Sequence, residues 1–167
     1  DWLNEANASV PKGEDCGFGS YLASIDAIAM GRKTFEQVVG FGVYPYGEKP
    51  LFVLTNREGA DAEGLVPKRL RNKAQVISGQ SPTEVLRTVR EALSTKNGGG
   101  LEKPLHVYVD GGRTVQGFLD AGLIERVIMT EVPVTLGDGI PLFATEEQRD
   151  SLHLESRKEW DFGFVQK

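Results

Sequence analysis

The chain has 167 residues, a formal net charge of -5 and a hydrophobic content of 40%, values typical of one globular domain with a core of its own. The acidic balance argues against a nucleic-acid partner, and no apolar run reaches membrane-spanning length. Without a signal-peptide pattern, the sequence predicts a cytoplasmic protein with no membrane partner. Because Cys16 is the one cysteine, an internal disulfide and a cysteine-rich zinc site are excluded, and we expect no metal.

Short apolar runs alternate with helical patterns along the chain. The expected elements, in chain order, are helix 18–24, strand 27–30, helix 34–39, strands 51–55 and 75–78, a helix from 82 to about 94, strand 105–109, helix 115–121 and strand 124–132. The long helix has a clear start, because Ser81 can cap it and Glu84 completes a capping box. Residues 56–73 lack periodicity and are typical of loop, and 97–100 are expected to form a flexible surface loop.

Strands that alternate with helices predict crossovers and a mostly parallel central sheet with helices on both faces. After Val132 two strand-like runs follow without a long helix between them, which predicts an antiparallel edge at the C-terminal end of that sheet. The opening residues lack a preceding strand and the last run stops partway. We therefore expect one domain over residues 1–167 whose first strand is missing and whose last strand is cut short.

The apolar run at 27–30 ends in Gly31, Arg32, Lys33 and Thr34. A strand, a tight turn and a helix start in this order aim backbone N–H groups at one point, where an anion is favoured. Arg32 offers a planar fork of donors and Lys33 a point charge, both suited to a phosphate. The alternative is a capped helix with two solvated cations, because short motifs often match by chance.

A second turn of the same kind follows the run at 105–109 and contains Gly111, Gly112, Arg113 and Thr114. The glycines leave room for a pyrophosphate or a ring, and the helix dipole favours negative charge. The alternative is a turn that needs only the conformational freedom of glycine. Two such turns favour a ligand with more than one phosphate, although neither the G-x-G-x-x-G nor the P-loop pattern is present.

Four segments in this order resemble a known superfamily: DAIAMGRKTFE, LFVLTNR, LHVYVDGGRTVQGFL and LIERVIMTEVPVTLGDGIPLF. They are similar to the dihydrofolate reductase-like superfamily, and most of all to the C-terminal reductase domain of the bifunctional riboflavin-biosynthesis deaminase-reductase. The resemblance covers nearly the whole chain from Asp1 to Phe143. It implies an α/β fold, a three-layer sandwich of the dihydrofolate reductase type, and a homodimer. The zinc-ligand set of the deaminase half is missing, which excludes deamination.

The resemblance also implies NADPH as cofactor. It implies that Arg32, Lys33 and Thr34 hold phosphates, including the 2′-phosphate, and that the segment Thr55, Asn56 and Arg57 lies beside the adenosine. The Gly111-Gly112 turn, often a cis peptide in the family, would pass the pyrophosphate and nicotinamide, with Arg113 and Thr114 at the helix start.

A catalytic acid is less evident. Dihydrofolate reductases carry a carboxylate in the helix before the first turn. Asp15 is the nearest candidate here, ahead of Glu14, and a helix N-cap is its alternative role. The sequence therefore predicts an NADPH-dependent reductase that acts on a flat heterocycle, either a ribosylaminopyrimidine or a pterin. The other possibility is a nucleotide-binding sensor or partner protein that has lost catalysis.

Overall fold

The computed structural model describes residues 2–59, 64–96, 103–135, 137–139 and 141–167. The chain divides into two compact units, one formed by residues 19–123 and the other by the segments before and after it. The expected single domain stays a prediction, and each unit is described by itself.

The unit of residues 19–123 is built on a parallel sheet of four strands in the order β3-β2-β1-β4. The strands are β1 (Ala27–Gly31), β2 (Leu51–Thr55), β3 (Ala74–Ser78) and β4 (Val107–Asp110). The first four residues of β1 are fully buried, as expected for a central strand covered on both faces. Strand β2 has the bounds that the sequence predicts, whereas β4 starts two residues later than expected.

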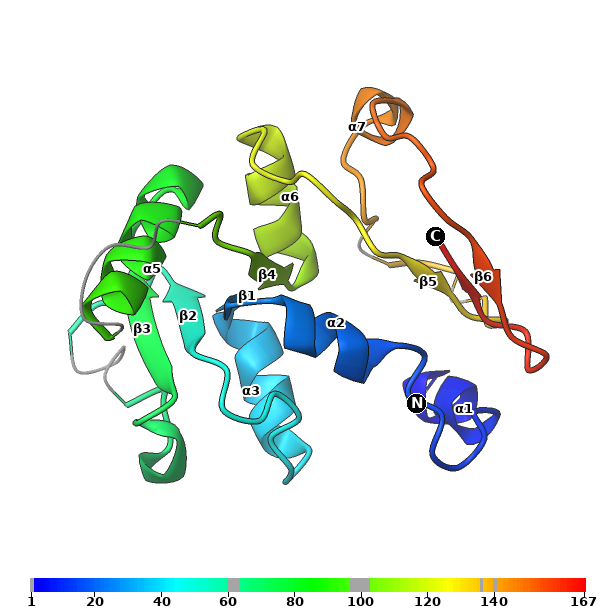
Figure 1. Cartoon of the computed structure of the whole chain (residues 1–167), viewed down its shortest axis with the longest axis horizontal. Coiled ribbons are helices and arrows are strands. Elements are labelled where there is room, and N and C mark those ends of the chain that lie inside the picture. Colours follow the sequence, from blue (N-terminus) through cyan, green and yellow to red (C-terminus); the bar gives the residue numbers. More distant parts are fainter. Residues whose placement is uncertain (1, 60–63, 97–102, 136, 140) are drawn as a thin grey trace. The chain divides into compact units, whose positions relative to one another are not determined.

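Helices cover both faces of this sheet (Figure 1). They are α3 (Arg32–Gly40), α5 (Pro82–Lys96) and α6 (Gly112–Asp120), with a short 3-10 helix η1 (Lys68–Leu70) and α2 (Phe18–Ser24) before β1. Helix α3 lies on one side of the strands, and α5 and α6 lie on the other. On the α3 side, Ile28 and Met30 pack with Phe35 and Val38 in one buried cluster. Helix α2 has the predicted bounds.

The start of α5 confirms the predicted capping box. The backbone N–H of Ser81 donates to the Glu84 carboxylate at 2.8 Å, and the Glu84 N–H donates back to the Ser81 hydroxyl at 3.4 Å. Val85 and Val89 are buried one turn apart, so the apolar stripe of the helix faces the sheet. The loop expected at residues 97–100 lies outside the described residues.

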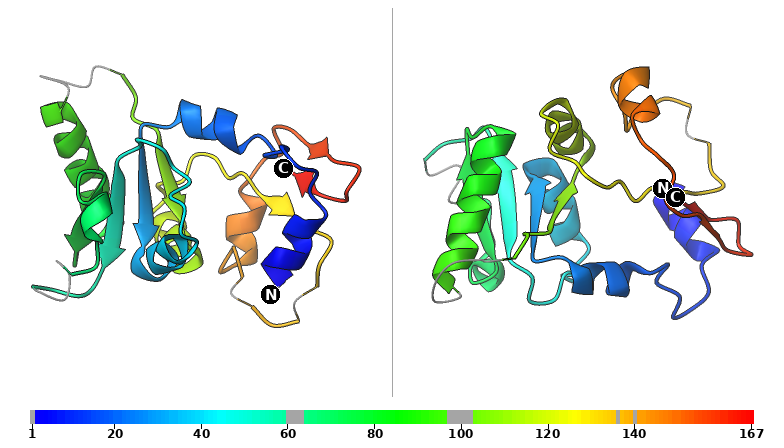
Figure 2. Two further views of the ribbon diagram at one scale, coloured as in Figure 1. Left: turned by 90° about the horizontal axis from the view of Figure 1, so that it is seen from below. Right: turned by 45° about the horizontal axis from the view of Figure 1, so that its top comes forward.

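The second unit contains a small antiparallel sheet in the order β5-β7-β6 (Figure 2). Its elements are α1 (Trp2–Ala8), β5 (Thr130–Glu131), α7 (Glu146–Asp150), β6 (Lys158–Glu159) and β7 (Val165–Gln166). The predicted antiparallel pairing is confirmed, but these strands form a sheet of their own. The strand expected over 124–132 is wrong in length, because only Thr130 and Glu131 have a strand partner along it.

No helix in the described parts of the chain is both long and apolar enough to cross a membrane.

Candidate functional site

The residues that the sequence assigns to a cofactor lie along one edge of the parallel sheet. Strands β1, β2 and β4 end there at Gly31, Thr55 and Asp110, and their registers pair Gly31 with Leu54 and Met30 with Asp110. Parallel strands bring their carboxyl ends to the same edge. The structure therefore brings together Gly31, Arg32, Lys33, Thr34, Thr55, Asn56, Arg57, Gly111, Gly112, Arg113 and Thr114.

The strand order gives this edge a switch point. The chain passes from β1 to β2 and β3 in one direction and then returns to place β4 on the other side of β1. In open α/β sheets, ligands bind outside the carboxyl ends of the strands where the direction reverses. Here that place lies between the ends of β1 and β4, where helices α3 and α6 begin.

The two helix starts interlock through reciprocal contacts. A Cβ atom built on Gly31 would lie 2.6 Å from the Thr114 hydroxyl oxygen, and one built on Gly111 would lie 2.5 Å from the Thr34 hydroxyl oxygen. Each glycine therefore makes room for the threonine of the other helix, so the packing needs both glycines whatever binds nearby. The Gly111-Gly112 peptide is not cis, and Gly111 has φ 97°, a conformation that side-chain-bearing residues rarely adopt.

Neither of these helices has a side-chain cap. The N-cap residues Gly31 and Gly111 offer none, whereas Ser81 and Thr145 cap α5 and α7. Thr34 does not cap α3 either, so the cap that the alternative assumes is absent, whereas the binding of a phosphate at this turn stays a prediction. First-turn N–H groups have no partner within a helix, and neither first turn carries an acidic residue. The paired starts thus present donors and positive dipole ends to one place, which fits a phosphate-bearing ligand.

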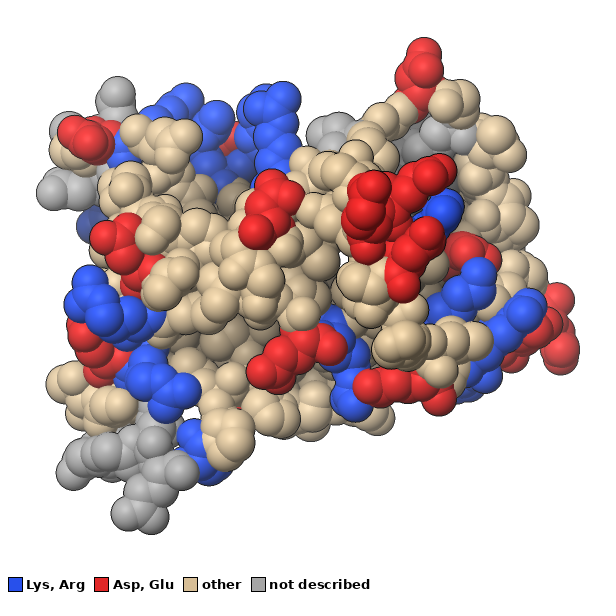
Figure 3. Space-filling view, turned by 90° about the horizontal axis from the view of Figure 1, so that it is seen from above, with Lys and Arg blue, Asp and Glu red and all other residues tan. Residues whose placement is uncertain are grey.

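The basic side chains at the two helix starts differ in whether they form an ion pair. Arg32 is paired with Glu36 one turn along α3, and its Nη1 atom donates to the two carboxylate oxygens at 2.7 and 2.9 Å. The guanidinium is therefore not simply solvated, and a phosphate would compete with Glu36 for it. Lys33 and Arg113 are exposed. Elsewhere, acidic and basic side chains are interspersed over the face in Figure 3.

The end of β2 forms a turn shaped by Thr55. Its hydroxyl accepts the N–H of Arg57 at 3.1 Å, and its carbonyl accepts the N–H of Gly79 at 3.0 Å. Asn56 and Arg57 are exposed. This turn lies beside the end of β1, the neighbouring strand.

A carboxylate that the sequence analysis did not select lies directly before the glycine turn. Asp110 accepts the N–H of Gly111 at 2.7 Å, and its charge acts on the nearby tyrosines Tyr46 and Tyr108. Tyr21 packs edge-on against Tyr108 with ring centroids 5.3 Å apart. Burial, and then the charge of Asp110, raise the pKa of Tyr46 and of Tyr108, so both hydroxyls remain proton donors at neutral pH.

One signal for this cluster is present in the sequence. Tyr108 and Asp110 are two residues apart in β4 and so share one face of the sheet. Tyr46 arrives from the connection between α3 and β2, and no local pattern predicts its contact.

Asp15 belongs to the other unit. It is exposed in the turn before α2, where its carboxylate accepts the N–H of Gly17 at 2.8 Å and its carbonyl accepts the N–H of Phe18 at 2.9 Å. This geometry shapes the entry to the helix, close to the N-cap alternative. The catalytic role of Asp15 stays a prediction.

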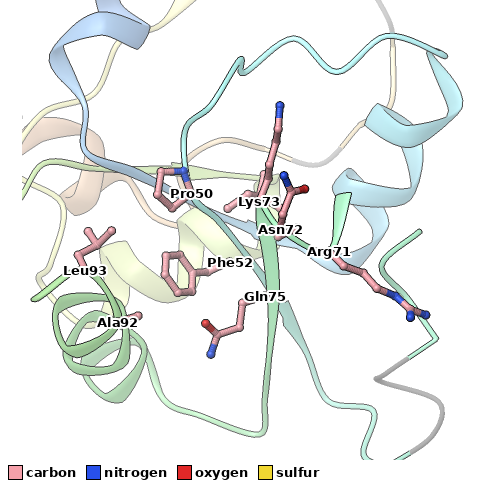
Figure 4. Close-up of a pocket in the computed structure, with 10 residues that line it drawn as sticks. Pro50, Phe52, Arg71, Asn72, Lys73, Gln75, Ala92 and Leu93 are labelled. Atoms are coloured by element: carbon pink, nitrogen blue, oxygen red, sulfur yellow. The ribbon is translucent and has the colours of Figure 1, made fainter. Parts of the chain in front are cut away.

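A cavity of about 240 Å³ lies at the opposite edge of the sheet (Figure 4). It opens where β2 and β3 begin, and one wall comes from α5. Its lining residues are Pro50, Leu51, Phe52, Arg71, Asn72, Lys73, Ala74, Gln75, Ala92 and Leu93. The glycine turns follow the carboxyl ends of the strands, so this cavity is separate from them. Among the described residues, no group of three or more His, Cys, Asp or Glu is arranged to hold a metal ion.

The fold and this edge define an α/β protein with a mostly parallel sheet, a small antiparallel sheet and a switch point between the ends of β1 and β4. A crystal structure of the "Putative riboflavin biosynthesis protein" from Shewanella sp. PV-4 has a similar fold. Its TM-score is 0.73 at 28% sequence identity, over 97% of this chain and 84% of that one.

Two Bacillus subtilis (strain 168) proteins are similar in sequence. "Uncharacterized protein YwjB" is 26% identical over 163 residues, covering 96% of this chain and 80% of the relative. "Uncharacterized protein YyaP" is 29% identical over 155 residues, covering 91% and 77%. No family model matches the chain.

Proposed function

We propose that this protein is an NADPH-dependent reductase of the dihydrofolate reductase or riboflavin-biosynthesis reductase type. One observation carries the proposal: two uncapped helices begin side by side at the switch point, interlocked through Gly31 with Thr114 and Gly111 with Thr34. Such a pair can hold two phosphate groups. The similarity to the Shewanella protein supports the same class of activity.

The candidate residues take separate parts in binding. Arg32, Lys33 and Thr34 would hold phosphates, including the 2′-phosphate that distinguishes NADPH from NADH. The segment of Thr55, Asn56 and Arg57 would flank the adenosine, and Gly111, Gly112, Arg113 and Thr114 would border the pyrophosphate and nicotinamide. When bound, the cofactor supplies a hydride.

The substrate is a flat heterocycle with an electrophilic carbon, either resembling 5-amino-6-(5-phosphoribosylamino)uracil or a pterin. The protein must orient that carbon, keep water away and supply a proton. Asp15 is the acid proposed from the sequence. A cytoplasmic homodimer also stays a prediction.

The test combines binding and turnover. NADPH affinity is measured by fluorescence titration, and NADPH oxidation is followed by absorbance with each heterocycle. Gly111→Ala should abolish both, whereas Gly122→Ala should preserve both, since nothing lies within 4 Å of a Cβ at Gly122. Binding without oxidation of any heterocycle would identify a nucleotide-binding protein without catalysis. Failure of the wild-type chain to bind NADPH would overturn the proposal.

A further inference from the structure

At the amino ends of β2 and β3, two side chains lie on the face of the sheet that α5 covers. Phe52 and Gln75 are register partners on these strands, and successive strand residues alternate between the two faces. Their neighbours Leu51 and Ala74 belong to the buried cluster that includes Phe35 of α3. Phe52 and Gln75 therefore lie on the opposite face, beside the cavity and α5 (Figure 4).

The cavity remains because this face is not filled with apolar side chains. Val85, Val89 and Leu93 of α5 are buried at four-residue spacing and form its apolar stripe. Beside Leu93, Ala92 has a small side chain, and Gln75 on the sheet is polar and exposed. The space of about 240 Å³ that they leave is smaller than a site for a drug-sized ligand, about 300–1,000 Å³, and suits a single substituted ring.

The inner wall of the cavity is apolar. Phe52 has 3% and Leu93 has 6% of its surface exposed, and Pro50 also lines the space. Figure 4 shows the Phe52 ring directed toward α5, the helix that carries Leu93. Aromatic rings pack well edge-to-face or offset against phenylalanine. The inner wall therefore favours a ligand with an aromatic ring.

The rim of the cavity is polar. Among the described residues that line it, none is Asp or Glu, and the side chains of Arg71, Asn72 and Gln75 have no hydrogen-bond or ion-pair partner in the described parts of the chain. The charge of Lys73 is compensated, because its Nζ atom lies 2.5 Å from a carboxylate oxygen of Glu48. Arg71 is exposed and extends away from α5 in Figure 4, so its charge is available to a ligand. The rim therefore favours an anionic group over a cationic one.

We propose that this cavity is a second ligand site, which binds a small aromatic carboxylate. The ring packs against Phe52 and Leu93 inside the cavity. The carboxylate lies at the rim, where the Asn72 and Gln75 amides donate hydrogen bonds and Arg71 supplies the opposite charge. Because the cavity lies at the other edge of the sheet from residues 31–34 and 111–114, this site does not depend on the proposed cofactor.

Three ligands with the same ring and different charge test the site: benzoate, neutral benzamide and cationic benzylamine. Each is titrated into the full chain while backbone amide chemical shifts are recorded. Benzoate should bind with a Kd of about 1 mM, as expected for so small a ligand, and should shift the amides of residues 51–52, 71–75 and 92–93. Benzamide should bind about threefold to tenfold more weakly, and benzylamine more weakly still. Equal Kd values for benzoate and benzylamine, or largest shifts at residues 31–34 and 111–114, would overturn the proposal.

Two variants separate the contribution of the ring from that of the charge. Ala92→Phe fills the cavity and should abolish benzoate binding, with circular dichroism to confirm that the variant is folded. Arg71→Gln should weaken benzoate about threefold to tenfold and leave the Kd of benzamide within about twofold; this result decides if Ala92→Phe does not fold. The matched control is Arg90→Gln, which removes an exposed arginine of α5 outside the lining and should leave both Kd values within about twofold.

Two results contradict the assignment of this cavity. One is benzoate binding that stays unchanged in Ala92→Phe or in Arg71→Gln. The other is the absence of benzoate binding to the wild-type chain at a concentration about tenfold above the expected Kd.

Discussion

Replacing Gly111 with alanine combines two separate kinds of strain. The backbone there has φ 97°, which costs a side-chain-bearing residue about 1–3 kcal/mol. The new Cβ would also lie 2.5 Å from the Thr34 hydroxyl oxygen, and overpacking of this kind costs about 1–3 kcal/mol. We expect Gly111→Ala to lower the free energy of unfolding by on the order of 4 kcal/mol.

Two other glycines separate the contributions. Gly31→Ala places a Cβ atom 2.6 Å from the Thr114 hydroxyl oxygen, but the backbone φ of -66° suits alanine. We therefore expect crowding alone to lower the free energy of unfolding by about 1–3 kcal/mol. At Gly122 an added Cβ atom would meet no atom within 4 Å, but the backbone φ is 65°. We therefore expect Gly122→Ala to lower the free energy of unfolding by about 1–2 kcal/mol through backbone strain alone.

Urea denaturation followed by circular dichroism measures all three variants. Thr34→Ala added to Gly111→Ala should restore the free energy of unfolding that crowding removed, about 1–3 kcal/mol. The loss caused by backbone strain should remain. If Gly111→Ala is no less stable than Gly122→Ala, or if Thr34→Ala recovers nothing, the interlocked arrangement of the two helix starts is refuted.

Three further variants test the charged groups. Glu36→Gln should release Arg32 and tighten NADPH about twofold to fivefold relative to NADH; an equal gain in Glu91→Gln, the control from the similar pair on α5, would contradict this. The backbone N–H of His106 and, to a smaller degree, Lys103 lower the pKa of Asp26. The ionised Asp26 therefore stabilises the folded chain at neutral pH, and this stabilisation is lost as the pH falls below about 4. Asp26→Asn should therefore cost about 1 kcal/mol at pH 7 and flatten the acid limb of the stability profile measured by urea denaturation. Asp15→Asn should slow turnover by about 10²–10⁴-fold if Asp15 is the acid, whereas an unchanged rate and pH profile would leave it a turn residue.

Local patterns predicted the elements whose signals are themselves local. The run Leu51–Thr55 is a strand with the expected bounds, and Ser81 with Glu84 marks the start of α5 through contacts three residues apart. The run at 124–132 shows the limit of this reasoning. Apolar side chains predict extended backbone, but a strand also needs a partner, and only Thr130 and Glu131 pair with β7.

In the candidate site, too, the features with local sequence signals could be predicted and the long-range contacts could not. Strand, glycine and helix start follow one another in the sequence at both turns, so their positions could be predicted. The contacts of Thr34 with Gly111 and of Thr114 with Gly31 depend on β1 and β4 being neighbours, which no local pattern states. Tyr46 reaches Asp110 from 64 residues away in the same manner.

Amide chemical shifts recorded during an NADPH titration test the central claim most directly. The account predicts that the largest changes fall on the backbone N–H groups of residues 31–34 and 111–114, where α3 and α6 begin. Largest changes around the cavity formed by Leu51, Lys73 and Leu93, with the two helix starts unaffected, would contradict it.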